Sequence, residues 1–336
     1  MTAEDSLLAR TFHSSVFRDQ RSLVELKRKK GLKISLAFPT LNEEATIAKE
    51  ILVLKTELMD RFPLIDEIVV IDSGSTDRTS EIAANFGAKV FASAEILANY
   101  GTFRGKGENL WKSLYVLDGD IIVWIDADIA NIDPKFLYGL VGPLLEYDDI
   151  GYVKAFYQRP IRSAEGLTPS GGGRVTEILI RPLFSLFYPE LAAFVQPLSG
   201  EYAGRRSILE QLPFSVGYGI EVGHLIDIFQ KFGPSVLAQV DMDVRIHRNQ
   251  TIEALSRMSY GVLSTFLDRL GTYGDIKVLK ELGDAHLALM AGDGGQRLVR
   301  SEISTVERPP MRTIEEYAKK FGQGPLTPQA SDPASL

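Results

Sequence analysis

Two aspartates, Asp126 and Asp128, are the side chains of this sequence best spaced to do chemistry. In an extended segment residues i and i+2 point the same way, so both carboxylates can face one ligand. Two carboxylates held that close repel each other unless a proton or a cation lies between them. A hard divalent ion such as Mg²⁺ or Mn²⁺ removes the repulsion and keeps positions free for phosphate oxygens. A polar turn that caps a helix is the alternative interpretation of the same pair.

A histidine in polar surroundings could complete such a metal site. His247 stands between Arg245 and Asn249, just after a predicted strand, and a neutral imidazole binds divalent metals well. The other histidines are interpreted as structural residues whose hydrogen bonds are satisfied: His13, His224 and His286.

Two glycine-containing segments precede predicted helices and could bind an anion. In residues 105–107 (Gly-Lys-Gly), the glycines would let the backbone approach a phosphate, and Lys106 would add a positive charge. The spacing around this segment does not fit an ATPase P-loop. Residues 171–176 (Gly-Gly-Gly-Arg-Val-Thr) are either a flexible linker or a cradle in which Arg174 and Thr176 hold a phosphate or a carboxylate.

The composition is that of a globular protein with ordinary patterning. The chain has 336 residues, which suits two domains or one large α/β domain with additions. Its net charge of −7 does not favour broad attraction to nucleic acid or to a membrane surface. Because it contains no cysteine, any metal must have oxygen and nitrogen ligands. No signal-like N-terminus and no long apolar run occurs, so we expect a soluble cytoplasmic protein.

Strands and helices alternate through the first half of the chain, which predicts parallel βαβ units. The predicted strands are 33–38, halted by Pro39, then 67–71, 89–92 and 121–125. The predicted helices are 43–61, 79–86, 107–117 and one that begins at Pro134. Polar clusters follow three of these strands, at residues 39–43, 72–77 and 126–128. Parallel sheets bind ligands at the carboxyl ends of their strands, so we expect these clusters to share one site.

After residue 150 the alternation becomes less regular. We predict strands at 151–158 and 236–244 and helices at 175–188, 219–231 and 252–270. The segment 217–223 is one residue out of register for a dinucleotide-binding fingerprint, which argues against an NAD-dependent enzyme. Residues 322–336 are rich in Pro, Gly, Ser and Gln and predict a disordered tail.

Taken together, the motifs and their order resemble a known family. Pro-x-Leu-Asn-Glu-Glu (39–44), Asp-Ser-Gly-Ser-Thr-Asp (72–77), Gly-Lys-Gly-Glu (105–108) and Asp-x-Asp are similar to the donor half of GT-A glycosyltransferases. The later motifs at 172–177, 197–206, 217–221 and 245–249 resemble glucosyl-3-phosphoglycerate and mannosyl-3-phosphoglycerate synthases. The resemblance covers about residues 10–320.

The resemblance implies a role for each matching position. Asp128 and His247 would ligate Mg²⁺ or Mn²⁺, with Asp126 beside them contacting the donor and Lys106 near the uracil or the diphosphate. Glu221, near Tyr218, would hold sugar hydroxyls. The residues implied for the nucleoside are Pro39, Leu41, Glu43 and Ser73, and those implied for the acceptor are Gly173, Arg174, Thr176 and Asn249. The implied catalytic set is Asp126, Asp128, Glu221 and Lys106. Ala127 replaces a serine that relatives often carry, and we expect little effect from this.

The same resemblance implies the architecture and the reaction. The fold would be an α/β GT-A fold with a Rossmann-like, mostly parallel sheet flanked by helices and a C-terminal acceptor-binding part. The divisions would be an N-terminal arm (1–30), a nucleotide-sugar-binding half (31–150), an acceptor-binding half with C-terminal helices (151–320) and the tail (321–336). The enzyme would be a homodimer, with the helix at 252–270 as a candidate interface.

The implied reaction moves glucose from UDP-glucose, or from GDP-glucose, to the 2-hydroxyl of 3-phospho-D-glycerate, with retention at the anomeric carbon. Three alternatives remain open at this point. A mannosyl-3-phosphoglycerate synthase would use GDP-mannose, and a polyprenyl-phosphate glycosyltransferase would share the first half of the chain. A non-catalytic nucleotide-sugar sensor would not need the acceptor cradle at 171–176.

Overall fold

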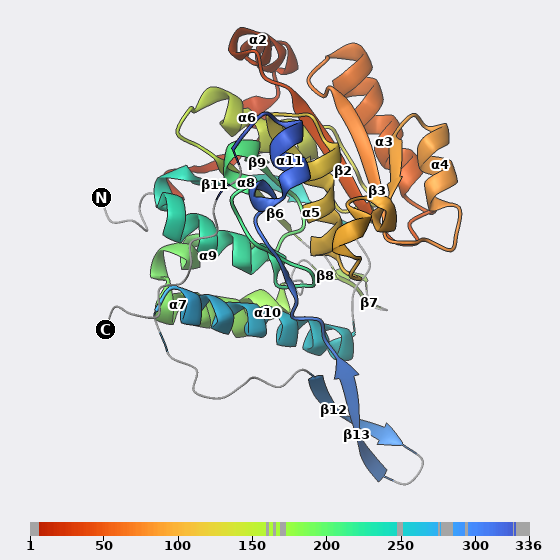
Figure 1. The fold of residues 1–336 in the computed structure, drawn as a ribbon, viewed down its shortest axis with the longest axis vertical. Coiled ribbons are helices and arrows are strands. Elements are labelled where there is room, and N and C mark those ends of the chain that lie inside the picture. Colours follow the sequence, from red (N-terminus) through yellow and green to blue (C-terminus); the bar gives the residue numbers. More distant parts are fainter. Residues whose placement is uncertain are drawn as a thin grey trace.

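An eight-stranded sheet forms the centre of the computed structural model (Figure 1). The structure describes residues 7–158, 161–163, 166–168, 173–246, 251–274, 276, 285–292, 295–324 and 326. The strand order is β1-β11-β6-β9-β5-β2-β3-β4, and β9 runs antiparallel to both of its neighbours while the other pairs are parallel. This mostly parallel sheet confirms the expected fold class.

The strands of the central sheet are β1 (Thr11–His13), β2 (Ile34–Thr40), β3 (Glu67–Asp72), β4 (Lys89–Ala92), β5 (Ile121–Trp124), β6 (Tyr152–Gln158), β9 (Tyr202–Arg205) and β11 (Leu237–Val244). Three two-stranded sheets add β7 (Ile161–Ser163) with β8 (Gly166–Thr168), β10 (Phe214–Ser215) with β14 (Glu307–Arg308), and β12 (Ala285–Gly292) with β13 (Gly295–Glu302). The α-helices are α2 (Gln20–Lys30), α3 (Ile47–Lys55), α4 (Thr79–Asn85), α5 (Lys106–Val116), α6 (Lys135–Glu146), α7 (Arg181–Phe187), α8 (Arg206–Leu209), α9 (Ile220–Phe232), α10 (Ile252–Thr272) and α11 (Glu315–Lys320).

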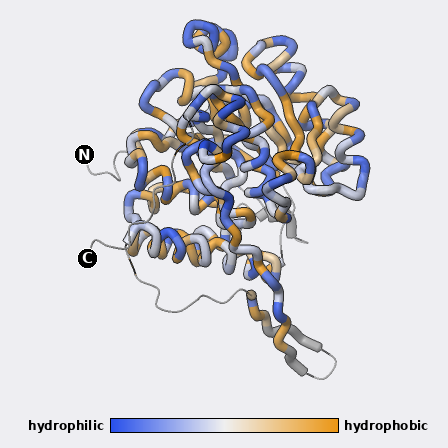
Figure 2. Tube along the Cα trace, in the orientation of Figure 1, coloured by the Kyte–Doolittle hydropathy of each residue, from blue (hydrophilic) through white to orange (hydrophobic). Residues whose placement is uncertain are grey.

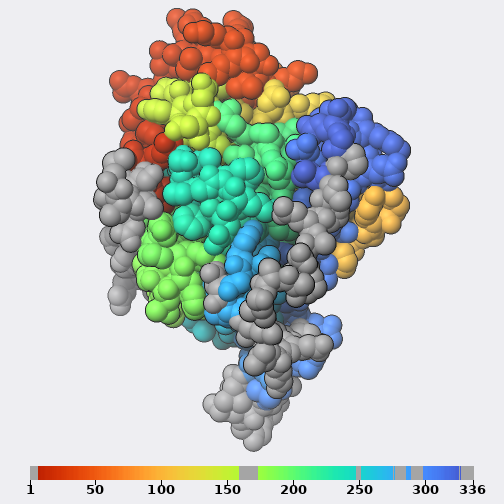
Figure 3. All heavy atoms as spheres, turned by 60° about the vertical axis from the view of Figure 1, so that its left-hand side comes forward, coloured from red at the N-terminus to blue at the C-terminus, as the bar shows by residue number. Residues whose placement is uncertain are grey.

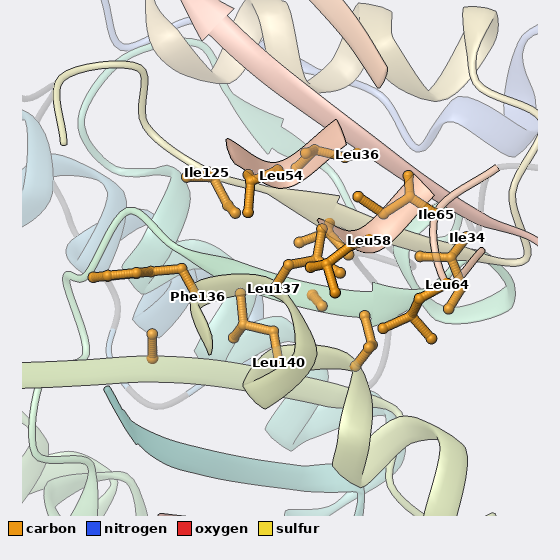
Figure 4. Packing of buried hydrophobic residues seen from close by; sticks show 14 of the residues in the cluster. Ile34, Leu36, Leu54, Leu58, Leu64, Ile65, Ile125, Phe136, Leu137 and Leu140 are labelled. Atoms are coloured by element: carbon orange, nitrogen blue, oxygen red, sulfur yellow. The ribbon is translucent and has the colours of Figure 1, made fainter. Parts of the chain in front are cut away.

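The central strands separate two hydrophobic cores, because successive side chains of a strand point to opposite faces. Ile121 and Val123 of β5 pack into the core that α3 and α6 cover, whereas Ile122 and Trp124 pack into the core that α5 and α9 cover. Figure 4 shows the first core, in which Leu137 of α6 lies among residues of α3 and β2. Both faces of the central strands are therefore buried, which explains why β5 and the middle of β3 are apolar, whereas the edge strands β1 and β4 are partly exposed. Figure 2 shows the hydropathy of the residues along the trace.

The strand that ends near Pro39 is longer than the sequence predicts. Proline lacks the N–H that a ladder needs, so we expected it to stop the strand. The structure continues β2 to Thr40, with Pro39 opposite Ile71 of β3. On its other side β5 ends opposite Ala37, so the missing N–H of Pro39 costs no hydrogen bond to β5.

Two predicted helices are divided in the structure. The segment predicted at 43–61 begins at Ile47 as α3 and changes to a π-helix at Thr56–Arg61. Its predicted apolar face is nonetheless buried, as Ile47, Ile51 and Leu58 show. The segment predicted at 175–188 is a π-helix at Thr176–Ile180 followed by α7.

The C-terminal part contains elements that the sequence did not predict. The hairpin β12–β13 projects from the body, at the opposite end of the molecule from α2 (Figures 1 and 3). Farther along, β14 pairs with β10 and α11 packs on the core. Residues 325 and 327–336 of the predicted tail lie outside the described residues. Within the described part, no helix has the length and apolar character needed to cross a membrane.

Candidate active site

A pocket of about 570 Å³ opens at the carboxyl ends of β2, β3 and β5, where the sequence placed its polar clusters. Its position follows the general rule for parallel sheets. Its lining residues are Pro39, Thr40, Leu41, Glu43, Ser73, Arg104, Gly105, Lys106, Asn109, Asp126, Gly217, Tyr218, Glu302, Ile303 and Ser304.

The loops that follow β2 and β3 are hydrogen-bonded to each other, which gives this end of the pocket a defined shape. The carboxylate of Asp72 accepts hydrogen bonds from the backbone N–H groups of Gly74 and Ser75. The side-chain oxygen of Asn42 accepts from the N–H of Thr76 at 2.8 Å, and the N–H of Asn42 donates to Ser75 Oγ at 2.9 Å. Asn42 has φ of 60°, a conformation that asparagine tolerates better than most residues.

Helix α3 fixes the loop that carries the two aspartates. Thr46 Oγ1 donates to the carbonyl of Ala127, and Lys49 Nζ donates to the carbonyl of Ala130 at 2.7 Å. Glu50 accepts from the N–H of Ile129 at 2.8 Å, and burial raises the pKa of this carboxyl well above its usual range. The Asp-x-Asp segment is therefore held by contacts to its own backbone at Ala127 and to the backbone just after Asp128.

Lys106, the first residue of α5, links two of the predicted site carboxylates. Its Nζ lies 2.5 Å from Asp126 Oδ1 and 3.1 Å from Glu221 Oε1. Although burial opposes its charge, these carboxylates raise the pKa of Lys106, so the side chain stays an ammonium. Gly107, expected to approach a phosphate, instead packs against the chain, since a Cβ there would lie 1.9 Å from the carbonyl oxygen of Ser215.

Arg245 occupies the other side of the aspartate pair. Its Nη2 donates to Asp128 Oδ1 at 2.7 Å and to Asp126 Oδ2 at 3.3 Å, and it lies 3.0 Å from Oε1 of the buried Glu201. Burial raises the pKa of Asp128, and the neighbouring charge of Asp126 raises it further, while Arg245 lowers it. Among the described residues, four carboxylates, Glu221 included, thus make ion pairs with the two cations Lys106 and Arg245.

This excess of negative charge fits a divalent cation at Asp128, whose carboxylate is one-third exposed. Within the described ranges, no three Asp, Glu or His side chains are grouped closely enough to hold a metal by themselves. His247 lies outside these ranges, but the residue before it is described. The N–H of Ile246 donates to Asn131 Oδ1 at 2.8 Å, and its carbonyl accepts from the N–H of Ala130 at 3.1 Å. Ile246 is therefore fixed to the loop that carries Asp128.

The predicted acceptor cradle is described only in part. Gly173 has φ of 81°, and its carbonyl accepts the N–H of Glu177, so the chain turns sharply into the helical segment. Thr176 is buried in the first turn of that segment. Residues 171 and 172 and Asn249 lie outside the described residues. None of the three described cradle residues (Gly173, Arg174 and Thr176) lines the pocket.

Most of the predicted donor residues come together in the structure. Pro39, Leu41, Glu43, Ser73, Lys106, Asp126 and Tyr218 all line the pocket, and Glu221 joins them through its ion pair with Lys106. The sequence did not predict that Glu302, Ile303 and Ser304, from the C-terminal segment, would line the pocket. Glu201 and Arg245 lie within the motifs at 197–206 and 245–249, but the sequence predicted a role for neither.

The prediction that the hydrogen bonds of His224 are satisfied is wrong, although its structural role is consistent with its burial. His224 is structural and fully buried, but both of its ring nitrogens lack a hydrogen-bond partner in the described structure. It packs edge-on against Phe214, with ring centroids 4.4 Å apart, and beside Trp124. Burial lowers its pKa well below the usual value, so the ring is neutral and is held by packing instead of hydrogen bonds.

Comparison with known proteins adds an independent observation. A family model described as Glycosyl transferase family 2 matches residues 35–212, which include the loops after β2 and β3 and both aspartates. The chain is 59% identical over 320 residues to a glucosyl-3-phosphoglycerate synthase from Petrotoga mobilis, covering 95% of this chain and 98% of that protein.

Solved structures match most of the chain. Mannosyl-3-phosphoglycerate synthase from Rubrobacter xylanophilus has a TM-score of 0.85 at 38% identity, covering 92% of this chain and 99% of that chain. Glucosyl-3-phosphoglycerate synthase from Mycobacterium tuberculosis, in complex with Mn²⁺, UDP and phosphoglyceric acid, has a TM-score of 0.77 at 40% identity. That match covers 87% of this chain and 94% of the other. Further structures of the same enzyme hold Mn²⁺ with UDP-glucose and phosphoglyceric acid, or Mg²⁺ with UDP.

Proposed function

The chain belongs to glycosyl transferase family 2 and, within it, to the glucosyl-3-phosphoglycerate synthases, and from this premise we propose how its side chains carry out the reaction. The enzyme transfers glucose from UDP-glucose to 3-phosphoglycerate with the help of Mg²⁺ or Mn²⁺. The observation that carries the assignment of roles is the ion-paired group of Lys106, Asp126 and Glu221 at the pocket.

The nucleotide end of the donor lies in the half of the chain at 31–150. The loops that follow β2 and β3 supply Pro39, Leu41, Glu43 and Ser73 to the pocket, and their mutual hydrogen bonds keep the nucleoside site in shape before UDP-glucose binds. Asp128 and His247 hold the cation. When bound, the cation neutralises charge that develops on the departing diphosphate.

The sugar end of the donor lies against the ion-paired group. Glu221 accepts hydrogen bonds from glucose hydroxyls, and its ion pair with Lys106 fixes where its carboxylate points. Asp126 shares Lys106 and contacts the donor on the other side. These contacts fix the position of the anomeric carbon. We assign the group this positioning role, and no covalent intermediate forms on it.

The acceptor lies in the half of the chain at 151–320. Gly173, Arg174, Thr176 and Asn249 hold 3-phosphoglycerate so that its 2-hydroxyl faces the anomeric carbon. The hydroxyl attacks on the side from which UDP leaves: the new carbon–oxygen bond forms as the bond to the diphosphate breaks, and a diphosphate oxygen takes the hydroxyl proton. This order of events retains the anomeric configuration.

A donor panel tests the assignment of the reaction. UDP-glucose, GDP-glucose and GDP-mannose are each incubated with 3-phosphoglycerate and Mn²⁺, and the released nucleotide diphosphate is measured. We expect UDP-glucose to give a kcat/KM at least about tenfold above the other donors, since contacts to one base and one hydroxyl discriminate by that order. A preference for GDP-mannose would assign the chain to mannosyl transfer.

Arg174 is expected to select the phosphorylated acceptor. Replacing it by alanine removes a charge-assisted contact to the phosphate, so the KM for 3-phosphoglycerate should rise about tenfold to a hundredfold. The KM for UDP-glucose should stay nearly unchanged, because Arg174 does not line the donor pocket. If the wild-type enzyme uses plain glycerate as well as 3-phosphoglycerate, the cradle is wrongly assigned.

We further place the enzyme in the cytoplasm, where nucleotide sugars and phosphorylated acids occur, and we assign it a homodimeric state. The hairpin β12–β13 supports dimer formation, because Leu287 and Leu298 lie on one face of it and are 54% and 63% exposed. Ile252 of α10, the predicted interface helix, is 63% exposed as well. Sedimentation velocity at micromolar concentration measures the assembly directly.

A further inference from the structure

A buried pair of opposite charges, Arg245 and Glu201, lies directly behind the two aspartates and has no part in the mechanism above. Arg245 is 4% exposed and Glu201 is fully buried. Three carboxylates crowd around one nitrogen of the guanidinium, Nη2, which has two hydrogens. Both hydrogens are used by Asp126 and Asp128, and the 3.0 Å approach of Glu201 Oε1 is an ion pair without a hydrogen bond.

This arrangement leaves two buried polar atoms unsatisfied. Arg245 Nε and Glu201 Oε1 both lack a hydrogen-bond partner among the described residues. A buried donor or acceptor without a partner is costly, and such atoms are rare in folded proteins. The other oxygen of Glu201 accepts a short hydrogen bond from the hydroxyl of Tyr157. This bond holds the carboxylate in place, while Oε1 accepts no hydrogen bond from the described residues.

The two unsatisfied atoms complement each other. Arginine binds a carboxylate best through two adjacent nitrogens at once, in a fork of parallel hydrogen bonds. A small rotation of the guanidinium from Asp128 toward Glu201 would place Nε and Nη2 on the Glu201 carboxylate and satisfy both atoms. That movement would also release Asp128 Oδ1 from its 2.7 Å hydrogen bond.

The neighbouring groups cannot make this adjustment in place of Arg245. Asp126 is held at 2.5 Å by Lys106, and it lies so close to Gly200 that a Cβ there would be 2.0 Å from its Oδ2. The backbone after Asp128 is fixed to α3 through Ile129 and Ala130. The long side chain of Arg245 is thus the part of the cluster free to change its acceptor.

We propose that Glu201 is a positioning residue that sets how tightly Asp128 binds the divalent cation, by offering Arg245 a second carboxylate. A cation and Arg245 compete for the same Asp128 carboxylate, and like charges close together repel. Glu201 reduces the competition because it draws the guanidinium away and neutralises it. This inference rests on the proposed role of Asp128 as a metal ligand.

The test measures Mn²⁺ binding without substrate, from the water-proton relaxation rate or the electron paramagnetic resonance signal of free Mn²⁺. Glu201→Gln keeps the shape of the side chain but removes its charge, so Arg245 should stay on Asp128. We expect Mn²⁺ to bind about tenfold more weakly. The double variant Glu201→Gln with Arg245→Met should regain at least the wild-type affinity, since the competing cation is gone.

Two further variants complete the design. Glu67→Gln changes another buried, ion-paired carboxylate at the opposite end of β3 and should leave Mn²⁺ binding unchanged. Asp128→Asn should lose most Mn²⁺ binding. If it does not, the metal assignment fails on its own, and the result is distinguishable from a failure of the Glu201 proposal.

Two results would overturn the role of Glu201. The first is wild-type Mn²⁺ affinity in Glu201→Gln, as expected of a carboxyl that is neutral and only fills space. The second is a double variant as weak as the single one, because Glu201 would then act without Arg245. Should the double variant not fold, Arg245→Lys replaces it: lysine keeps the charge but lacks the fork, so Mn²⁺ should bind several-fold more weakly. Unchanged binding in that variant counts against the proposal as well.

Discussion

Asp128→Asn is expected to lower kcat/KM by at least about 10³-fold, because the enzyme then loses the charge that holds the cation at the departing diphosphate. The carboxylate follows β5, whose four residues are fully buried, and is itself one-third exposed. Among the described residues around it, four carboxylates share ion pairs with two cations. Asparagine keeps the size of the side chain, so a large loss would report the charge and not a cavity.

The measurement is initial-rate kinetics with saturating 3-phosphoglycerate, together with a titration of Mn²⁺. Wild-type enzyme should be inactive in excess chelator and should recover when Mn²⁺ or Mg²⁺ is added back. Asp133→Asn is the matched control, since this aspartate follows in the same loop and its side chain accepts the N–H of Lys135, the first residue of α6. Full turnover of Asp128→Asn, or of the wild-type enzyme in excess chelator, would show that the reaction does not need the site.

The sheet and the pocket were predictable because local sequence carries their signals. A strand buried on both faces is mainly apolar, and Ile121–Trp124 and residues 68–71 of β3 could be recognised in that way. The polar clusters stand directly after these strands in the chain. Since parallel strands end at the same edge, their residues had to meet there.

The antiparallel strand β9 carries no such signal. Its sequence, Tyr-Ala-Gly-Arg, contains one glycine and one arginine, and it becomes a strand because β5 and β6 lie on either side of it. The sequence did not predict Glu201 and Arg245 as site residues for the same reason, because their contact depends on strand pairing. Glu201 and Arg245 are far apart in sequence and meet only after β9 and β11 have joined the sheet. The pocket wall at 302–304 likewise depends on the pairing of β14 with β10.

Glu221 could stabilise the start of α9 or bind the sugar, and the two roles predict losses of activity of very different size. It lies in the first turn of α9, where a carboxylate interacts favourably with the helix dipole by a few tenths of a kcal/mol. A role limited to the dipole would let Glu221→Gln keep nearly full turnover with slightly lower stability. The helix dipole does not explain two features of Glu221. It is 7% exposed, and its carboxylate lies 3.1 Å from Lys106, which also pairs with Asp126.

We expect Glu221→Gln to lower kcat/KM for UDP-glucose by about 10²-fold, because a small displacement of the anomeric carbon from the acceptor hydroxyl is costly. The affinity for UDP, which lacks the sugar, should change little, and calorimetry can measure it separately. Glu253→Gln is the matched control, as Glu253 lies in the first turn of α10 but is exposed. A loss confined to Glu221 therefore cannot come from the dipole.

A double variant with Lys106 provides a second, independent test of the role of Glu221. If Glu221 and Lys106 act as one unit on the donor, Lys106→Met combined with Glu221→Gln should cost much less than the product of the two single losses. If the two losses multiply instead, Glu221 acts on the sugar alone and the ion pair does not contribute to its position. Near-wild-type turnover in Glu221→Gln would return the residue to a structural role at the start of α9 and leave the sugar without its proposed anchor.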